Sequence, residues 1–469
     1  MSRRSLWFSI SFAVLSTSPL VAHAQAVDPP VDLLAREAVP GGLRARDVVD
    51  AVVNTSFERQ ARLVEVEAAR AEIDRANLLF VPRVSVSASY TRLSPIDAPV
   101  LGVLAAPATQ TPGPIAPGTP LVGIPLSFPV ILDQTAFRAQ LAVPVTDYFL
   151  RVLPARDASE HGANAAQAMV EVSEARLALE AETLYWSWVR AELGIEVAER
   201  AAAQAQAHLE DAQRLLNAGL VTRSDVARAE AQRAQMQELV MTTEHARDAA
   251  RDRMRTIMHV ESLPTAIGES LAGADVNDVD LEEAVTRAHD QRAEFVAIRE
   301  QLAALGAQRT LQDAALYPRL DLVGEALLAN PNARYVPQTE RFDFTWAVGA
   351  QASWQLTDML NVEPQQRSLD ARVASLEAQR ETAREGVRAE VVDAHRALRD
   401  AASMITSREA QLASAEETLA LAQNVYREGR GTSLVVVDAQ TLVARTSLDL
   451  LQARIDARIA QARLLRATR

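Results

Sequence analysis

The sequence contains no cysteine and no lysine, although its 469 residues include 48 arginines. Without cysteine the chain has no disulfide, no thiolate metal ligand, no thiol nucleophile and no lipidated N-terminal cysteine. Without lysine it has no lysine-containing phosphate loop and no Schiff-base chemistry. Aromatic residues make up only 4%, which favours thin contacts between helices over one thick globular core. The net charge of −13 argues against a nucleic-acid partner, which would need a basic surface.

The N-terminus has the pattern of a secretory signal peptide. Arg3 and Arg4 precede a short apolar run, and Ala22-His23-Ala24 has the form of a cleavage site. We therefore predict a signal peptide over residues 1–24 and an N-terminal linker over 25–42. No later segment supplies the roughly 18 consecutive apolar residues of a transmembrane helix. If the exported chain enters a membrane, we expect it to do so as a β-barrel.

The remaining sequence consists of two similar halves. Several markers recur at an offset of 210 positions: Gly219 and Gly429, Thr222 and Thr432, Val226 and Val436, Ala229 and Ala439. Such self-similarity indicates an internal duplication. We place the first structural repeat at 43–260, an equatorial linker at 261–280 and the second repeat at 281–469.

The first half is longer because of one proline-rich segment. Nine of the 21 prolines lie between Pro95 and Pro129. Proline is excluded from helix interiors and central strands. We therefore predict a long exposed loop over 94–135.

Each half also predicts a long helical hairpin. No proline occurs between Pro154 and Pro264 or after Pro364, and these windows are rich in strong helix formers. Apolar residues recur at three- and four-residue steps, as in a coiled coil. The helices are interrupted by glycine at two tips, 217–225 and 427–435, where Gly is typical of a helix end.

Four segments alternate apolar and polar residues and predict strands: about 83–93, 136–148, 319–329 and 342–357. Strands of this length with one apolar face fit the wall of a membrane barrel. A soluble antiparallel sheet with one buried face gives the same alternation. Four strands do not close a barrel, and an open edge is not allowed in lipid. Several copies must therefore associate, and twelve strands from three copies leave a conduit where eight do not.

These features resemble the TolC-like outer membrane efflux protein family over essentially the whole mature chain. The segments that carry the resemblance are the helix end 76–85, its second copy Tyr317-Pro318-Arg319-Leu320, and the two tips at 218–226 and 426–429. The resemblance implies an α+β membrane protein. It would be a homotrimer with a 12-stranded β-barrel, four strands per chain, continued by a long antiparallel α-helical coiled-coil barrel.

The resemblance also implies a location and partners. The barrel would lie in outer membrane lipid and the helical part in the periplasm. The chain would be the exit duct of a tripartite efflux pump or a type I secretion system. A periplasmic adaptor (membrane fusion) protein would dock on it, and an inner-membrane transporter would supply the energy. The sequence does not separate drug, metal and protein export.

Individual tip residues match the family pattern. The resemblance assigns adaptor docking to eight of them: Gly219, Leu220, Val221, Thr222, Ser224, Gly429, Gly431 and Thr432. It assigns a periplasmic gate to Asp225, Tyr426 and Asp438, with a Tyr426–Asp225 contact. Two positions depart from well-known members, since Gly431 replaces an arginine and Val435 replaces an acidic residue. A purely structural role as helix caps remains the alternative for each tip residue.

No enzyme or cofactor is expected. The seven histidines never form a zinc-binding His-x-x-x-His pair, and neither Gly-x-Ser-x-Gly nor Gly-x-Gly-x-x-Gly occurs. The competing class of function is a soluble periplasmic coiled-coil scaffold or adaptor. In that class the strands would form a water-soluble cap.

Overall fold

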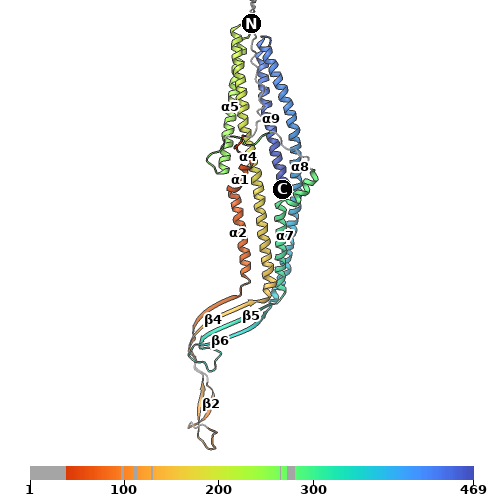
Figure 1. Cartoon of the computed structure of the whole chain (residues 1–469). Helices are drawn as coiled ribbons and strands as arrows, with labels where there is room; N and C mark the ends of the chain where they lie inside the picture. Colours follow the sequence, from red (N-terminus) through yellow and green to blue (C-terminus); the bar gives the residue numbers. More distant parts are fainter. Residues whose placement is uncertain (1–38, 97–99, 109–112, 128–129, 265, 272–279) are drawn as a thin grey trace, which may run out of the picture.

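The computed structural model describes residues 39–469 except 97–99, 109–112, 128–129, 265 and 272–279. The predicted signal peptide and most of the predicted linker 25–42 lie outside the described residues. The chain forms a long helical body that ends in a curved β-sheet, and a small separate hairpin projects beyond this sheet (Figure 1).

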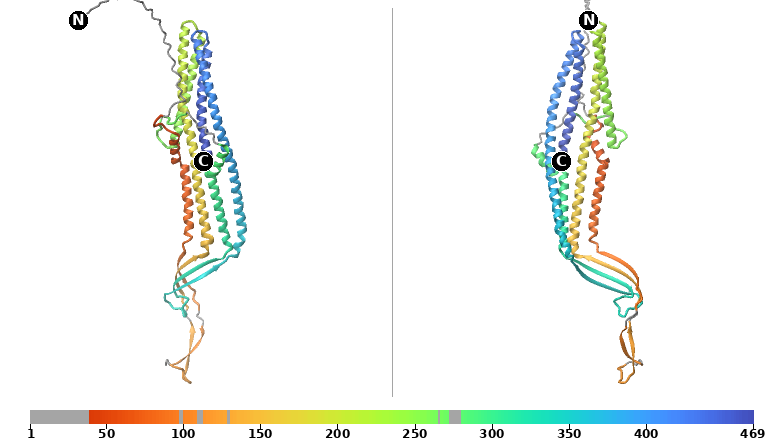
Figure 2. Two further views of the ribbon diagram at one scale, coloured as in Figure 1. Left: turned by 45° about the vertical axis from the view of Figure 1, so that its right-hand side comes forward. Right: turned by 180° about the vertical axis from the view of Figure 1, so that it is seen from behind.

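Two very long helices run the length of the helical body. They are α4 (Leu153–Asn217), with 65 residues, and α8 (Leu356–Arg427), with 72. At about 1.5 Å per residue they are roughly 98 and 108 Å long. Two shorter helices stack beside each of them: α5 (Arg223–Met258) and α2 (Phe57–Leu78) along α4, α9 (Ser433–Ala467) and α7 (Ala293–Asp313) along α8 (Figures 1 and 2).

The order of elements repeats once. In the first half, α1 (Ala45–Thr55) and α2 precede two strands of the large sheet, which are followed by α4 and α5. In the second half, α6 (Leu281–Gln291) and α7 precede two strands, which are followed by α8 and α9. Short helical turns lie where the sheet meets the helices: α3 (Val145–Asp147), η2 (Tyr148–Val152) and η3 (Ala314–Leu316).

The sheet contains four antiparallel strands in the order β1-β4-β5-β6. Their bounds are Arg83–Arg92, Asp133–Pro144, Arg319–Asn330 and Asp343–Ser353. The register aligns the alternation of all four strands, since Val86 pairs with Ala139, Ala139 with Ala326 and Ala326 with Trp346. Because alternate residues share a face, the sheet has one continuous apolar face.

The predicted bounds of two strands, about 136–148 and 342–357, were wrong at their ends. β4 starts at Asp133 and stops at Pro144, not at 148, because proline lacks the N–H that the ladder needs and the chain then turns into α3. β6 stops at Ser353, not at 357. Ser353 pairs with Arg319, the first residue of β5, and Pro318 before it cannot extend the pairing.

The predicted long loop 94–135 was also wrong in part. It contains β2 (Val100–Pro107) and β3 (Leu121–Ser127), which pair antiparallel as a separate two-stranded sheet. The prolines exclude a central strand, but in a two-stranded ribbon every strand has an open edge that tolerates proline.

A buried carboxylate fixes the joint between sheet and helices. The Asp147 side chain in α3 is only 5% exposed. It accepts a hydrogen bond from Arg319 Nε at 2.9 Å and another from Arg151. The backbone N–H of Leu320 donates to Thr146 Oγ1 at 2.9 Å. The start of β5 is therefore tied to α3, which leads through η2 into the long helix α4.

The largest core cluster lies near the middle of the helical body. Tyr185, Trp186 and Trp188 of α4 are fully buried there, and α1, α5 and α9 pack around them. The Tyr185 hydroxyl donates to Leu43 O at 2.9 Å. Along the described parts of the chain, no helix is both long and apolar enough to cross a membrane.

Candidate functional site

The two helical hairpins turn at the same end of the molecule, opposite the sheet (Figures 1 and 2). In the first turn, Gly219 has a φ of +75°, a left-handed conformation that favours glycine. The N–H groups of Gly219 and Leu220 donate to the carbonyls of Leu216 and Leu215, both at 2.9 Å. These two bonds form a Schellman motif, the helix end that the sequence predicts.

The returning helix α5 begins with a capping box formed by Thr222 and Asp225. Thr222 Oγ1 accepts a hydrogen bond from Asp225 N at 3.3 Å, and Asp225 Oδ2 accepts one from Thr222 N at 3.0 Å. The Thr222 hydroxyl also donates to Asp225 Oδ2 at 2.7 Å. Hydrogen bonds from Thr222 hold the pKa of the Asp225 carboxyl below its usual range. Ser224, in the first turn of α5, is exposed.

The second turn repeats the helix end but not the cap. Gly429 has a φ of +69°, and its N–H donates to Tyr426 O at 2.9 Å. The Thr432 side chain precedes α9 without making a capping hydrogen bond. A Cβ at Gly431 would lie only 3.1 Å from Tyr426 N. The close approach explains why this position holds a glycine.

The predicted gate residue Tyr426 is buried between the two hairpins. It is 1% exposed, and its ring centroid lies 5.0 Å from that of His208 on α4. Its hydroxyl has no hydrogen-bond partner in the described chain. The Tyr426–Asp225 contact is therefore not a hydrogen bond here, because Asp225 bonds to Thr222 instead. Burial raises the pKa of Tyr426, and the nearby Asp225 carboxylate adds to this effect.

Sequence reasoning missed His208 and Ser433. His208 is 5% exposed, and its Nε2 lies 3.0 Å from Ser433 Oγ at the start of α9. Burial lowers the pKa of His208, although Asp211 and Asp225 partly oppose this shift. The one signal in the sequence is the position of His208 between Ala205 and Ala212, at helical spacing on an apolar stripe.

The third predicted gate residue, Asp438, is exposed on α9. Other contacts join the hairpins, since Arg427 pairs with Asp211 at 3.4 Å and Gln440 Nε2 donates to Gln204 O at 3.0 Å. Large apolar side chains are exposed on both tips: Leu220 at 59%, Val435 at 52% and Leu434 at 45%.

In the part of the chain that the structure describes, no group of three or more His, Asp or Glu side chains is arranged to hold a metal ion. The tip residues are helix caps, a buried ring pair and exposed apolar side chains. This arrangement is suited to packing against another protein and to holding the two hairpins together.

Comparison with known proteins agrees with this architecture. The sequence matches the outer membrane efflux protein family over residues 55–258 and 284–468. Among curated proteins, none matches the sequence.

Several solved structures share the fold. The outer-membrane channel OprN is 20% identical, with a TM-score of 0.68 over 93% of this chain and 95% of that one. The CmeC outer membrane channel of Campylobacter jejuni is 13% identical, with a TM-score of 0.69 over 90% and 85%. The outer membrane protein VceC of Vibrio cholerae is 16% identical, with a TM-score of 0.68 over 90% and 95%.

The family match spans both halves and both tips, and it confirms the resemblance and the outer-membrane location expected from the sequence. The chain therefore belongs to the outer membrane efflux protein family, whose members are channels rather than enzymes.

Proposed function

We propose that three copies of this chain form the exit duct of a tripartite efflux pump or a type I secretion system. The duct is a passive conduit through the outer membrane. A periplasmic adaptor docks on its helical tips, and an inner-membrane transporter supplies the energy. The observation that carries this proposal is the apolar face of the four-stranded sheet.

That face is both continuous and exposed. On β1, Val86 is 78% exposed, and on β6 Trp346 and Val348 are 67% and 77% exposed. The opposite face is polar, with Arg138 and Glu325 paired at 3.2 Å across neighbouring strands. Exposed apolar area of this kind on a soluble monomer would favour aggregation. In a barrel, the apolar face contacts lipid and the polar face lines the channel.

The edges of the sheet support association of several copies. The outer edges of β1 and β6 are unpaired in the described chain, and lipid does not satisfy free backbone N–H and C=O groups. Because the strands alternate in direction and number four, β6 of one copy can pair antiparallel with β1 of the next. Three copies give twelve strands, enough to leave an open interior where eight strands would be filled by side chains.

The tips carry the docking and gating parts of the proposal. Leu220, Leu434 and Val435 would contact the adaptor, because they are the large apolar side chains exposed at the turns. Tyr426 and Asp225 would hold the two hairpins of one copy in place. Asp438, exposed on α9, would form an acidic ring with its symmetry mates.

Fractionation and mass distinguish the duct from a soluble scaffold. The duct should sediment with outer membranes, resist extraction by sarkosyl and have the mass of a trimer by light scattering in detergent. Release by osmotic shock as a detergent-free monomer would contradict it.

Conductance tests the gate. In a planar bilayer, Asp438→Ala should weaken block by divalent cations, since the proposed ring would lose three negative charges. Asp456→Ala, an exposed position further along α9, is the matched control. Unchanged conductance and block in Asp438→Ala would remove Asp438 from the gate.

A further inference from the structure

The β2–β3 hairpin is a feature of the first half alone. It leaves the end of β1, returns to β4, and projects beyond the sheet on the side away from the helices (Figures 1 and 2). In the second half, β5 and β6 are joined only by residues 331–342. The duplicated architecture does not require the hairpin, so it calls for a separate explanation.

The hairpin is apolar on both faces. The sequence has no charged residue and no histidine from 98 to 132. Leu104 pairs with Ile124 on one face, and these side chains are 57% and 52% exposed. Val103 and Leu121 on the other face are 68% and 53% exposed. An isolated two-stranded hairpin is marginally stable in water, and large exposed apolar patches indicate contact sites. We therefore expect both faces of the hairpin to be buried against a partner surface.

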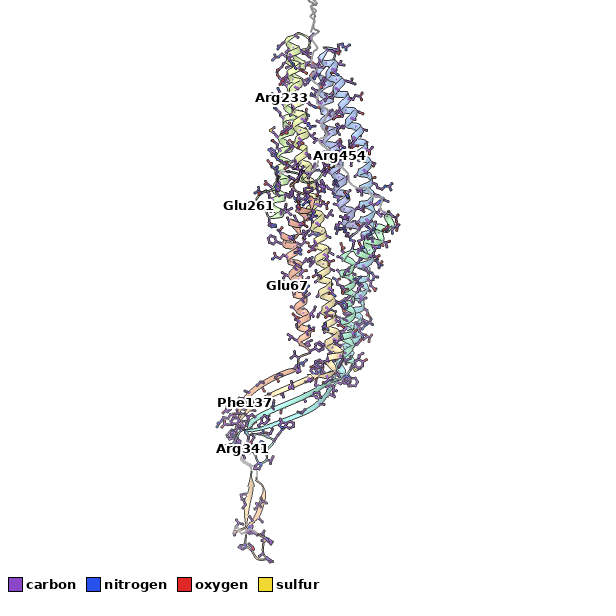
Figure 3. All side chains as sticks on the ribbon, in the orientation of Figure 1. Glu67, Phe137, Arg233, Glu261, Arg341 and Arg454 are labelled. Carbon is purple, nitrogen blue, oxygen red and sulfur yellow. The ribbon has the colours of Figure 1, made fainter. Side chains whose placement is uncertain are left out.

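Membrane lipid is poorly placed to contact the two apolar faces of the hairpin. Charged pairs mark the end of the sheet nearest the hairpin. Arg92 pairs with Asp133 at 2.9 Å, and Arg341 with Asp343 at 2.9 Å. Figure 3 shows Arg341 and Phe137 at this end of the sheet. Because charges are costly inside hydrocarbon, they place the membrane boundary there, and the hairpin lies beyond it.

We propose that the hairpins of three copies pack against one another about the threefold axis and cover the outer mouth of the duct. This inference rests on the trimer of the proposed function. A cyclic trimer has head-to-tail contacts, so each copy meets its two neighbours through two different surfaces. A hairpin with two apolar faces supplies both surfaces. It also follows β1 along the chain, and β1 is the edge strand that a neighbouring copy would pair with.

The hairpin is long enough to reach the axis. β2 contains eight residues, which at about 3.3 Å per residue span roughly 26 Å. Twelve strands about 4.8 Å apart and tilted by about 40° enclose a barrel roughly 12 Å in radius. Hairpins that lean inward from the rim can therefore meet above the channel.

Cysteine cross-linking tests the contact, and the chain has no cysteine of its own to interfere. The double variant Leu104→Cys with Leu121→Cys places one thiol on each face. With a short bis-maleimide it should give a covalent trimer on denaturing gels. Either single variant should give no covalent trimer, because one thiol per copy can join only two copies. Glu67→Cys with Glu261→Cys, two exposed positions on the helical part, is the control and should give none.

A second variant tests the consequence for the channel. Leu104→Asp with Val122→Asp puts charges on one face and should separate the hairpins, so that single-channel conductance increases. The trimer mass in detergent should stay unchanged, since the four-stranded sheet is untouched.

The outcomes separate this inference from the proposed function. A trimer by light scattering with no covalent trimer from the double-cysteine variant would overturn the hairpin contact alone. Brominated lipids that quench a fluorophore attached to the thiol of the Leu104→Cys variant would identify lipid as the cover and overturn it too. A single-copy mass in detergent would overturn the proposed duct and the contact together.

Discussion

Replacing Asp147 with alanine removes the carboxylate that joins the sheet to α4. Three charge-assisted hydrogen bonds end on it, one from Arg151 and two from Arg319. Each such bond contributes about 1.5–3 kcal/mol net. The two arginine side chains are 27% and 37% exposed, so water would partly replace the lost partner. We therefore expect the free energy of unfolding to fall by about 3 kcal/mol, near the lower end of the range for breaking a buried ion pair.

The assay is urea unfolding in detergent, followed by tryptophan fluorescence. The matched control is Glu65→Ala on α2, which breaks an exposed pair with Arg62 at 2.8 Å. Exposed pairs of this kind contribute at most about 1 kcal/mol. Equal losses in the two variants would refute the idea that burial makes the Asp147 cluster strong.

The pH dependence gives an independent check. Burial alone would raise the pKa of Asp147, but the hydrogen bonds and charges of Arg319 and Arg151 outweigh it and leave this pKa below its usual value. A carboxylate with a lowered pKa stabilises the fold above its ordinary pKa of about 3.9 and loses this contribution below it. The difference between wild type and Asp147→Ala should stay constant from pH 7 to 5 and shrink below about pH 4.

Three further predictions concern the tips. Thr222→Ala removes the α5 cap, which should cost about 1 kcal/mol and speed hydrogen exchange of the Asp225 amide, whereas Ser224→Ala should change little. Gly431→Ala should destabilise by about 1–3 kcal/mol through crowding of Tyr426, seen as a lower melting temperature, while Gly306→Ala in an open part of α7 should not destabilise. Because burial lowers the pKa of His208, tip stability should fall as the pH drops below about 6.5. His208→Gln should remove this pH dependence, and an unchanged slope would show that another group titrates.

The features that could be predicted from sequence are those encoded by local patterns. Gly219 and Gly429 mark the helix ends, Thr222 and Asp225 mark a cap, and alternation marks the four strands. Each of these signals lies within a few residues along the chain. Because the sequence consists of two similar halves, the helix-end and strand patterns each occur a second time, and the second occurrence supports the first.

The features that were missed depend on contacts between distant residues. Asp147 meets Arg319 across 172 positions and His208 meets Ser433 across 225, so no local pattern reveals either pair. The end of β6 was misplaced because it is set by Pro318, which precedes the neighbouring strand β5. The β2–β3 hairpin was missed because proline excludes helix interiors and central strands but not the open edges of a two-stranded hairpin.

Because α4 and α8 are unbroken, only certain insertions of residues can lengthen such a duct. One residue added to a helix turns everything beyond it by about 100° and moves it by about 1.5 Å. A single insertion would therefore rotate a packed face away from its partner. Insertions of seven or eleven residues, which shift the face by only about 20°, would be tolerated if α5 and α9 lengthened with them. Changes in the length of the duct should thus occur in steps shared by the neighbouring helices, whereas helix periodicity sets no such step for the connection between β1 and β4.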